Sequence, residues 1–169
     1  MTMTIAVALF PRLTALDAIG PYEVLQRLPD TDVVFVGHER GVVRSENGYL
    51  GLTVDATFGE VPRPDVVVVP GGIGSRALLD DDVILDWVRG AHATTRFTTS
   101  VCTGSLVLAA AGLLDGATAA THWSCHDELR ALGAVPVPDR VVEHLDDRIL
   151  TAAGVSSGID MGLRLAALL

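Results

Sequence analysis

The chain has 169 residues, 49 % of them hydrophobic and 20 % charged, which fits a single folded domain over residues 1–169 and excludes a disordered chain. The formal net charge of −9 argues against direct nucleic-acid or anionic-membrane binding, because an acidic surface repels phosphate. No apolar run is long enough to cross a bilayer. Residues 1–10 are typical of a strand rather than an export leader, so we expect a cytoplasmic protein with two free thiols.

Strands and helices are predicted to alternate along the chain. Runs rich in β-branched residues predict strands at 4–10, 32–37, 65–69, 97–101 and 118–121, with strand-like pieces near 135, 141–142 and 148–151. Helical spacing predicts helices at 20–28, 83–88, 104–114, 124–132 and 159–169, and turn residues predict a hairpin within 37–53 at the edge of the sheet. Because strand 65–69 is almost entirely valine, we expect an α/β fold: a doubly wound, mostly parallel sheet with helices on both faces.

The segment from Thr98 to Leu106 carries the strongest functional signal. It predicts a strand, a sharp turn at Cys102 and a helix that starts close to the strand through Gly104 and Ser105. The α/β-hydrolases present a nucleophilic serine at such a turn, and the helix N-terminus lowers the pKa of a thiol. Most lone cysteines in cytosolic proteins are inert core residues, but this context favours a nucleophile.

A nucleophilic thiol needs a partner that moves its proton. Thr103 follows Cys102, so a pair with an adjacent histidine is absent. Carboxyl candidates follow the first strand, at the same edge of the sheet. From spacing alone, Asp17 is more readily explained as a helix N-cap than as a catalytic group, and Glu23 as a solvated helical residue.

Two further segments are candidates for the wall of the site. Gly71 and Gly72 end the valine strand, and their N–H groups either stabilise a developing negative charge or only form a tight turn. His122, Cys125 and His126 have the spacing of one helix face, but three ligands with the first outside the helix do not predict a metal site. His122 or Trp123 lining a pocket is the simpler interpretation.

Several segments, taken together, resemble one family over nearly the whole chain. These segments are 10–11, 16–17, 20–21, 68–72, 101–114, 120–123 and 153–160. The chain resembles the ThiJ/PfpI superfamily, which is glutamine amidotransferase-like, and within it the isocyanide hydratase branch. The resemblance implies a flavodoxin-like homodimer with a cysteine nucleophile and no cofactor.

The resemblance also implies roles for particular residues. Asp17 and Thr103 match the pair used by the hydratase branch. The resemblance therefore implies that Asp17 is a catalytic acid/base and not only a helix cap, and it argues against peptidase activity. Cys102 would attack the terminal carbon of an isocyanide, the small-molecule substrate, and water would release the formamide from a thioimidate. Ile19, Val155 and Trp123 are expected to line an apolar pocket.

Two alternatives remain at this stage. Similar Cys-Thr-Gly and Thr-His-Trp segments occur in the sensor domains of AraC-type regulators, which predicts non-catalytic ligand sensing. Another thiol enzyme of the superfamily, such as a glyoxalase-type lyase, is the third interpretation. If Cys102 is the nucleophile, its backbone should be strained, Asp17 should approach its sulfur, and mild peroxide should oxidise Cys102 and not Cys125.

Overall fold

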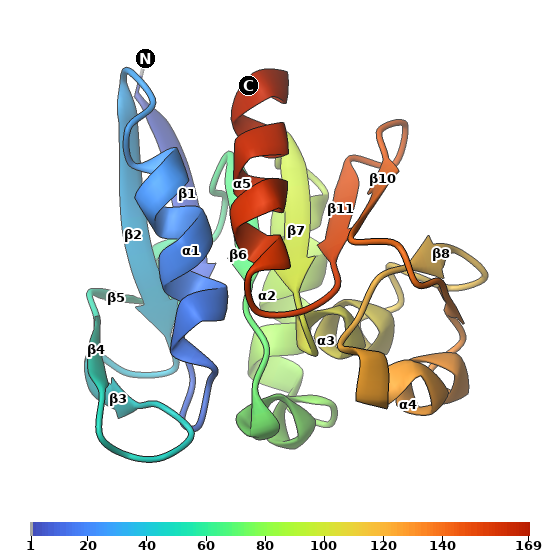
Figure 1. Ribbon diagram of the computed structural model, residues 1–169. Helices are drawn as coiled ribbons and strands as arrows, with labels where there is room; N and C mark the ends of the chain where they lie inside the picture. The colour runs from blue at the N-terminus through green and yellow to red at the C-terminus, as the bar shows by residue number, and fades with distance from the viewer. Residues whose placement is uncertain (1) are drawn as a thin grey trace.

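A seven-stranded sheet forms the centre of the computed structural model, which describes residues 2–169 and leaves Met1 of the expected domain outside (Figure 1). The strands are, in order across the sheet, β10 (Val141–His144), β11 (Ile149–Ala152), β7 (Phe97–Val101), β6 (Val66–Val69), β1 (Met3–Ala8), β2 (Thr31–Gly37) and β5 (Ala56–Thr57). All neighbours pair in parallel except β10, which is antiparallel to β11. The predicted doubly wound, flavodoxin-like architecture is confirmed.

Helices cover both faces of this sheet. Helices α1 (Ala15–Leu25) and α5 (Ser157–Leu168) pack together in front of it in Figure 1, and α2 (Asp82–His92) and α3 (Gly104–Ala110) lie behind it. All four valines of β6 are fully buried, as expected of a strand covered on both faces. Both layers of helices therefore share one core.

Helix α1 begins five residues earlier than predicted. Thr14 is its N-cap, and Pro21 lies inside it, where proline normally disfavours a helix. The ring is accommodated because Pro21 packs where α5 carries Gly158 and Gly162. The earlier start matters for function, since it places Asp17 within the first helical turn.

The smaller elements also differ in part from their predictions. The hairpin is confirmed as β3 (Gly41–Arg44) and β4 (Gly51–Val54), which form a sheet of their own. The strand predicted at 118–121 is shorter and lies outside the main sheet, because β8 (Thr118–Ala119) pairs with β9 (Val135–Pro136). The remaining elements are the short helices η1 (Phe58–Glu60), η2 (Ile73–Leu78), η3 (Trp123–Cys125) and α4 (His126–Ala131).

Three further helices differ from their predictions, and the first of them, predicted at 83–88, is longer because α2 continues to His92. The helix predicted to reach residue 114 ends at Ala110, because Gly112 and Gly116 have φ of 81° and 69° and turn the chain. The helix predicted at 124–132 is the η3 turn followed by α4. Within residues 2–169, no helix combines the length and the apolar character needed to cross a membrane.

Candidate active site

Cys102 occupies the sharp turn between β7 and α3. Its φ of 57° lies in the left-handed region, which residues other than glycine rarely adopt, so the predicted strain is confirmed. Gly104 lets α3 start directly against β6, since a Cβ there would collide with the carbonyl oxygen of Val69. The Thr121 hydroxyl donates to the Cys102 carbonyl at 3.2 Å and helps to hold the turn.

The Cys102 sulfur receives hydrogen bonds from two backbone N–H groups on different elements. One belongs to Thr103 at the start of α3, and the other to Val155 in the loop between β11 and α5. Val155 has φ of 41°, so a second strained residue contacts the sulfur. The sequence predicts only the side chain of Val155 as part of the site, because an ordinary valine carries no signal of a left-handed backbone.

Asp17 is a fully buried carboxyl beside this sulfur. It is the third residue of α1 and its side chain turns into the protein, so the N-cap interpretation is wrong. Oδ2 accepts a hydrogen bond from the Gly71 N–H at 3.1 Å, Oδ1 has no nitrogen or oxygen partner, and the Cys102 thiol also bonds to the carboxyl. The predicted approach of Asp17 to the sulfur is confirmed.

The two groups hold their protons more tightly than they would in water. Burial raises the pKa of Asp17 from 3.8 to about 7, opposed by the hydrogen bonds from Gly71 and Cys102 and reinforced by the charge of Glu46. Burial also raises the pKa of Cys102 from 9.0 to about 12, and the negative charge of Asp17 adds to the rise. The predicted fall in the pKa of Cys102 is wrong, because burial outweighs the two N–H groups. Near neutral pH the pair therefore holds at least one proton.

The glycine turn after β6 holds Asp17 and Thr103 through its backbone N–H groups. The Gly71 N–H bonds to Asp17, and the Gly72 N–H donates to Oγ1 of Thr103 at 2.9 Å. Ser75 donates to the same Oγ1 at 2.9 Å, and that hydroxyl also contacts the Gly72 carbonyl at 3.1 Å. Of the two roles considered for Gly71 and Gly72, the hydrogen bonds favour the tight turn, since both N–H groups have partners within the protein.

A cavity of about 300 Å³ opens in front of Cys102. Of the predicted pocket residues, Gly72, His122 and Val155 line this cavity, together with Thr103. Ile19 lies outside it, because it stands two positions after Asp17 on α1 and so points to the other side of the helix. Gly71, also predicted as a pocket residue, lies outside the lining as well.

Trp123 is 79 % exposed and lines a neighbouring pocket instead. Glu46, Arg76 and Cys125 line the Cys102 cavity, although the sequence did not indicate them. Arg76 donates to a carboxylate oxygen of Glu128 at 2.8 Å and to the Cys125 sulfur at 3.3 Å. The lining of the Cys102 cavity therefore includes charged side chains of both signs.

The histidines near Cys125 do not form a metal centre. His122 precedes η3, and its Nδ1 lies 2.8 Å from the Ser124 hydroxyl. Across the part of the chain that the structure describes, no group of three or more His, Cys, Asp or Glu side chains is arranged to hold a metal ion. His122 instead borders the Cys102 cavity and the neighbouring pocket.

The fold and the site together define a class: α/β proteins that present a cysteine at a strained turn between a strand and a helix, beside a buried carboxyl. Within that class, the chain belongs to the DJ-1/PfpI family, whose model matches residues 3–168.

Known relatives include both enzymes and regulators. The chain is 48 % identical over 166 residues to a protein named isonitrile hydratase from Pseudomonas putida, which covers 98 % of this chain and 72 % of that protein. It is 32 % identical over 117 residues to the HTH-type transcriptional regulator GbdR from Pseudomonas aeruginosa, covering 69 % of this chain and 31 % of the regulator. A crystal structure of a ThiJ/PfpI family protein from Pseudomonas syringae superposes with a TM-score of 0.93 at 37 % identity, covering all of this chain and 69 % of that one.

Proposed function

We propose that this protein hydrates isocyanides, also called isonitriles, to N-substituted formamides, with Cys102 as the nucleophile. The observation that carries the proposal is the buried pair of the Asp17 carboxyl and the Cys102 thiol at the strained turn. The similarity to the Pseudomonas putida protein named isonitrile hydratase supports this substrate class.

In the first step, the sulfur and the proton of the Cys102 thiol both add to the terminal carbon of R–N≡C. Since the thiol has a pKa of about 12, it keeps its proton in the free protein near neutral pH. Asp17 takes that proton as the sulfur attacks, and then gives it to the same carbon. One C–S bond and one C–H bond form, and the product is the thioimidate R–N=CH–S–Cys102.

The second step returns the free thiol. Water adds to the thioimidate carbon, a proton moves to nitrogen, and the C–S bond of the tetrahedral intermediate breaks. The products are R–NH–CHO and the Cys102 thiol, so one isocyanide and one water are consumed in each cycle. Asp17 suits both proton transfers, because its pKa of about 7 makes the carboxylate and the carboxylic acid comparably populated at neutral pH.

The neighbouring groups position this pair. Thr103 fixes the glycine turn through Gly72, and Gly71 fixes the Asp17 carboxyl. The N–H groups of Thr103 and Val155 bond to the sulfur and stabilise negative charge on it during attack and release. These residues bind and orient the reacting atoms, and no cofactor takes part in the proposed steps.

Hydration of para-nitrophenyl isocyanide, followed through formamide absorbance, tests the proposal. We expect turnover by the wild-type protein and none by the Cys102→Ala variant, with circular dichroism showing that the variant is folded. Turnover that survives in Cys102→Ala contradicts the mechanism. Consumption of methylglyoxal without isocyanide turnover points to a glyoxalase-type activity instead.

Ligand sensing without catalysis is the second candidate function. The similarity to the regulator GbdR, which covers 69 % of this chain, favours it. Saturable binding of an isocyanide or formamide together with no turnover supports sensing, whereas turnover supports the enzyme.

We also propose that the chain is one domain that works as a homodimer in the cytoplasm. Leu16 on α1, together with Ile159 and Leu163 on α5, exposes apolar surface that a second copy would cover. Both cysteines are free thiols, which suits a reducing compartment. Light scattering of the purified protein measures the oligomeric state, and a monomer at micromolar concentration contradicts the dimer.

A further inference from the structure

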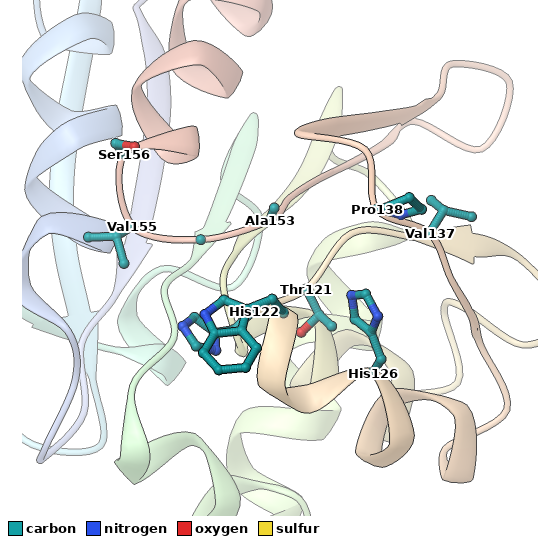
Figure 2. A pocket seen from close by; sticks show the side chains of 10 residues that line it. Thr121, His122, His126, Val137, Pro138, Ala153, Val155 and Ser156 are labelled. Atoms are coloured by element: carbon teal, nitrogen blue, oxygen red, sulfur yellow. The ribbon is translucent and has the colours of Figure 1, made fainter.

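A second pocket, of about 420 Å³, lies directly beside the Cys102 cavity. Figure 2 shows it bounded by the loop that carries Ala153, Val155 and Ser156 on one side and by Thr121, His122 and His126 on the other. Its lining residues are Thr121, His122, Trp123, His126, Val137, Pro138, Ala153, Gly154, Val155 and Ser156. Ionisable carboxylates and guanidinium groups are absent from this lining, in contrast to the Cys102 cavity.

The Cys102 cavity and the second pocket share a boundary. His122 and Val155 line both of them, and the backbone N–H of Val155 bonds to the Cys102 sulfur. In Figure 2, Val155 and His122 lie toward one end of the pocket, and Val137 and Pro138 lie at the other. One end of the pocket is therefore formed by residues that also border the Cys102 cavity, and the other end lies farther along the pocket at Val137 and Pro138.

An isocyanide needs such an arrangement, because the R–N≡C group is linear. When the terminal carbon contacts the Cys102 sulfur, the substituent R must leave the site along the line of the C–N bond. The Cys102 cavity itself is a poor place for an apolar substituent, since the charged side chains of Glu46 and Arg76 border it and would lose water when an apolar group fills it. The neighbouring pocket has no such cost.

From these observations, and resting on the proposed function, we propose that the second pocket holds the N-substituent and selects isocyanides with a large aromatic substituent. Its size fits this class, since a cavity of about 150 Å³ already holds benzene. The wall of the pocket also fits an aromatic substituent. The rings of His122 and Trp123 pack with centroids 5.4 Å apart, and the Trp123 indole, which is 79 % exposed, gains apolar contact when a substrate ring lies against it.

Competition between a small and a large substrate tests this inference. The quantity measured is the ratio of kcat/KM for 2-naphthyl isocyanide to kcat/KM for methyl isocyanide. In Val137→Phe the added ring fills the far end of the pocket, and we expect the ratio to fall by about tenfold. Val135→Phe is the matched control, because Val135 is 47 % exposed and lies outside the pocket lining, and its ratio should stay within about twofold of wild type.

Trp123→Ala gives a second variant that does not threaten folding, since the indole is exposed. We expect its ratio to fall by about fivefold through loss of the aromatic wall. An unchanged ratio in both Val137→Phe and Trp123→Ala overturns the inference, and so does an equal fall in the Val135→Phe control.

A binding measurement separates this inference from the proposed function. Calorimetry with N-(2-naphthyl)formamide requires no turnover, and we expect binding to wild type that weakens in Val137→Phe and not in Val135→Phe. If isocyanides are not hydrated but this pattern is found, the proposed function fails and the pocket assignment stands. If methyl isocyanide is hydrated and the formamide does not bind in the pocket, the assignment fails and the proposed function stands.

Discussion

Replacing Asp17 with asparagine should destroy activity and, above neutral pH, stabilise the fold. Asparagine keeps the shape of the side chain, and its Oδ1 still accepts from the Gly71 N–H. It carries neither charge nor a transferable proton. We therefore expect kcat/KM for isocyanide hydration to fall by roughly 100- to 10 000-fold, the usual contribution of a positioned acid/base group.

The gain in stability follows from the raised pKa of Asp17. The folded protein binds this proton more tightly than the unfolded chain does, so the stabilising contribution is complete below pH 3.8 and disappears as the pH rises to about 7. Between pH 5 and the pKa of about 7 lie about two pH units, each equivalent to about 1.36 kcal/mol. From pH 5 to pH 8, wild type should thus lose about 3 kcal/mol of unfolding free energy relative to Asp17→Asn.

Urea denaturation of both proteins at pH 5, 6, 7 and 8 measures this difference, because contributions from all other titrating groups cancel between the two. The control is Glu23→Gln, which removes an exposed carboxyl on the same helix and should give a pH-stability curve nearly parallel to that of wild type. Parallel curves for Asp17→Asn and wild type would refute the reasoning, since they would mean that ionising the buried carboxyl costs nothing.

Two more outcomes are expected. The value of kcat/KM should rise through pH 7 and then level off. The reason is that the pair is inactive when both groups are protonated, and that Asp17, with a pKa of about 7, loses the proton that makes the pair reactive. A profile that is flat from pH 5 to 8 contradicts this role. Thr103→Val should cost about 1–3 kcal/mol of unfolding free energy in urea denaturation, because it leaves the buried Gly72 N–H without its acceptor, while the Ser75 hydroxyl keeps the Gly72 carbonyl at 2.8 Å. Thr103→Ser, which keeps the hydroxyl, should recover most of that loss.

The sequence predicted the parts of this protein that depend on local pattern. The valine strand β6, the parallel sheet and the strained turn at Cys102 follow from residues that are adjacent in the chain, and each is confirmed. The start of α1 was missed because Pro21 and Gly20 are typical of a helix boundary, while contact with α5 makes them acceptable inside the helix.

The site was harder to predict, because its chemistry depends on contacts between distant segments. Spacing alone favoured a cap for Asp17, and only the resemblance to a family raised it to a catalytic role. The left-handed backbone of Val155 and the internal hydrogen bonds of Gly71 and Gly72 leave no mark in the sequence. The pKa of Cys102 was predicted in the wrong direction, because the helix N-terminus is visible in the sequence and the extent of burial is not.

The central claim is that the Cys102 sulfur bonds to the isocyanide carbon and that the whole substrate adds without a leaving group. Intact-protein and peptide mass spectrometry of rapidly quenched reactions with para-nitrophenyl isocyanide tests it most directly. We expect a transient adduct on the Cys102 peptide whose added mass equals that of the intact isocyanide, and no adduct in Cys102→Ala. Formamide production with no adduct at any time point, or an adduct on Cys125 in place of Cys102, would contradict the account.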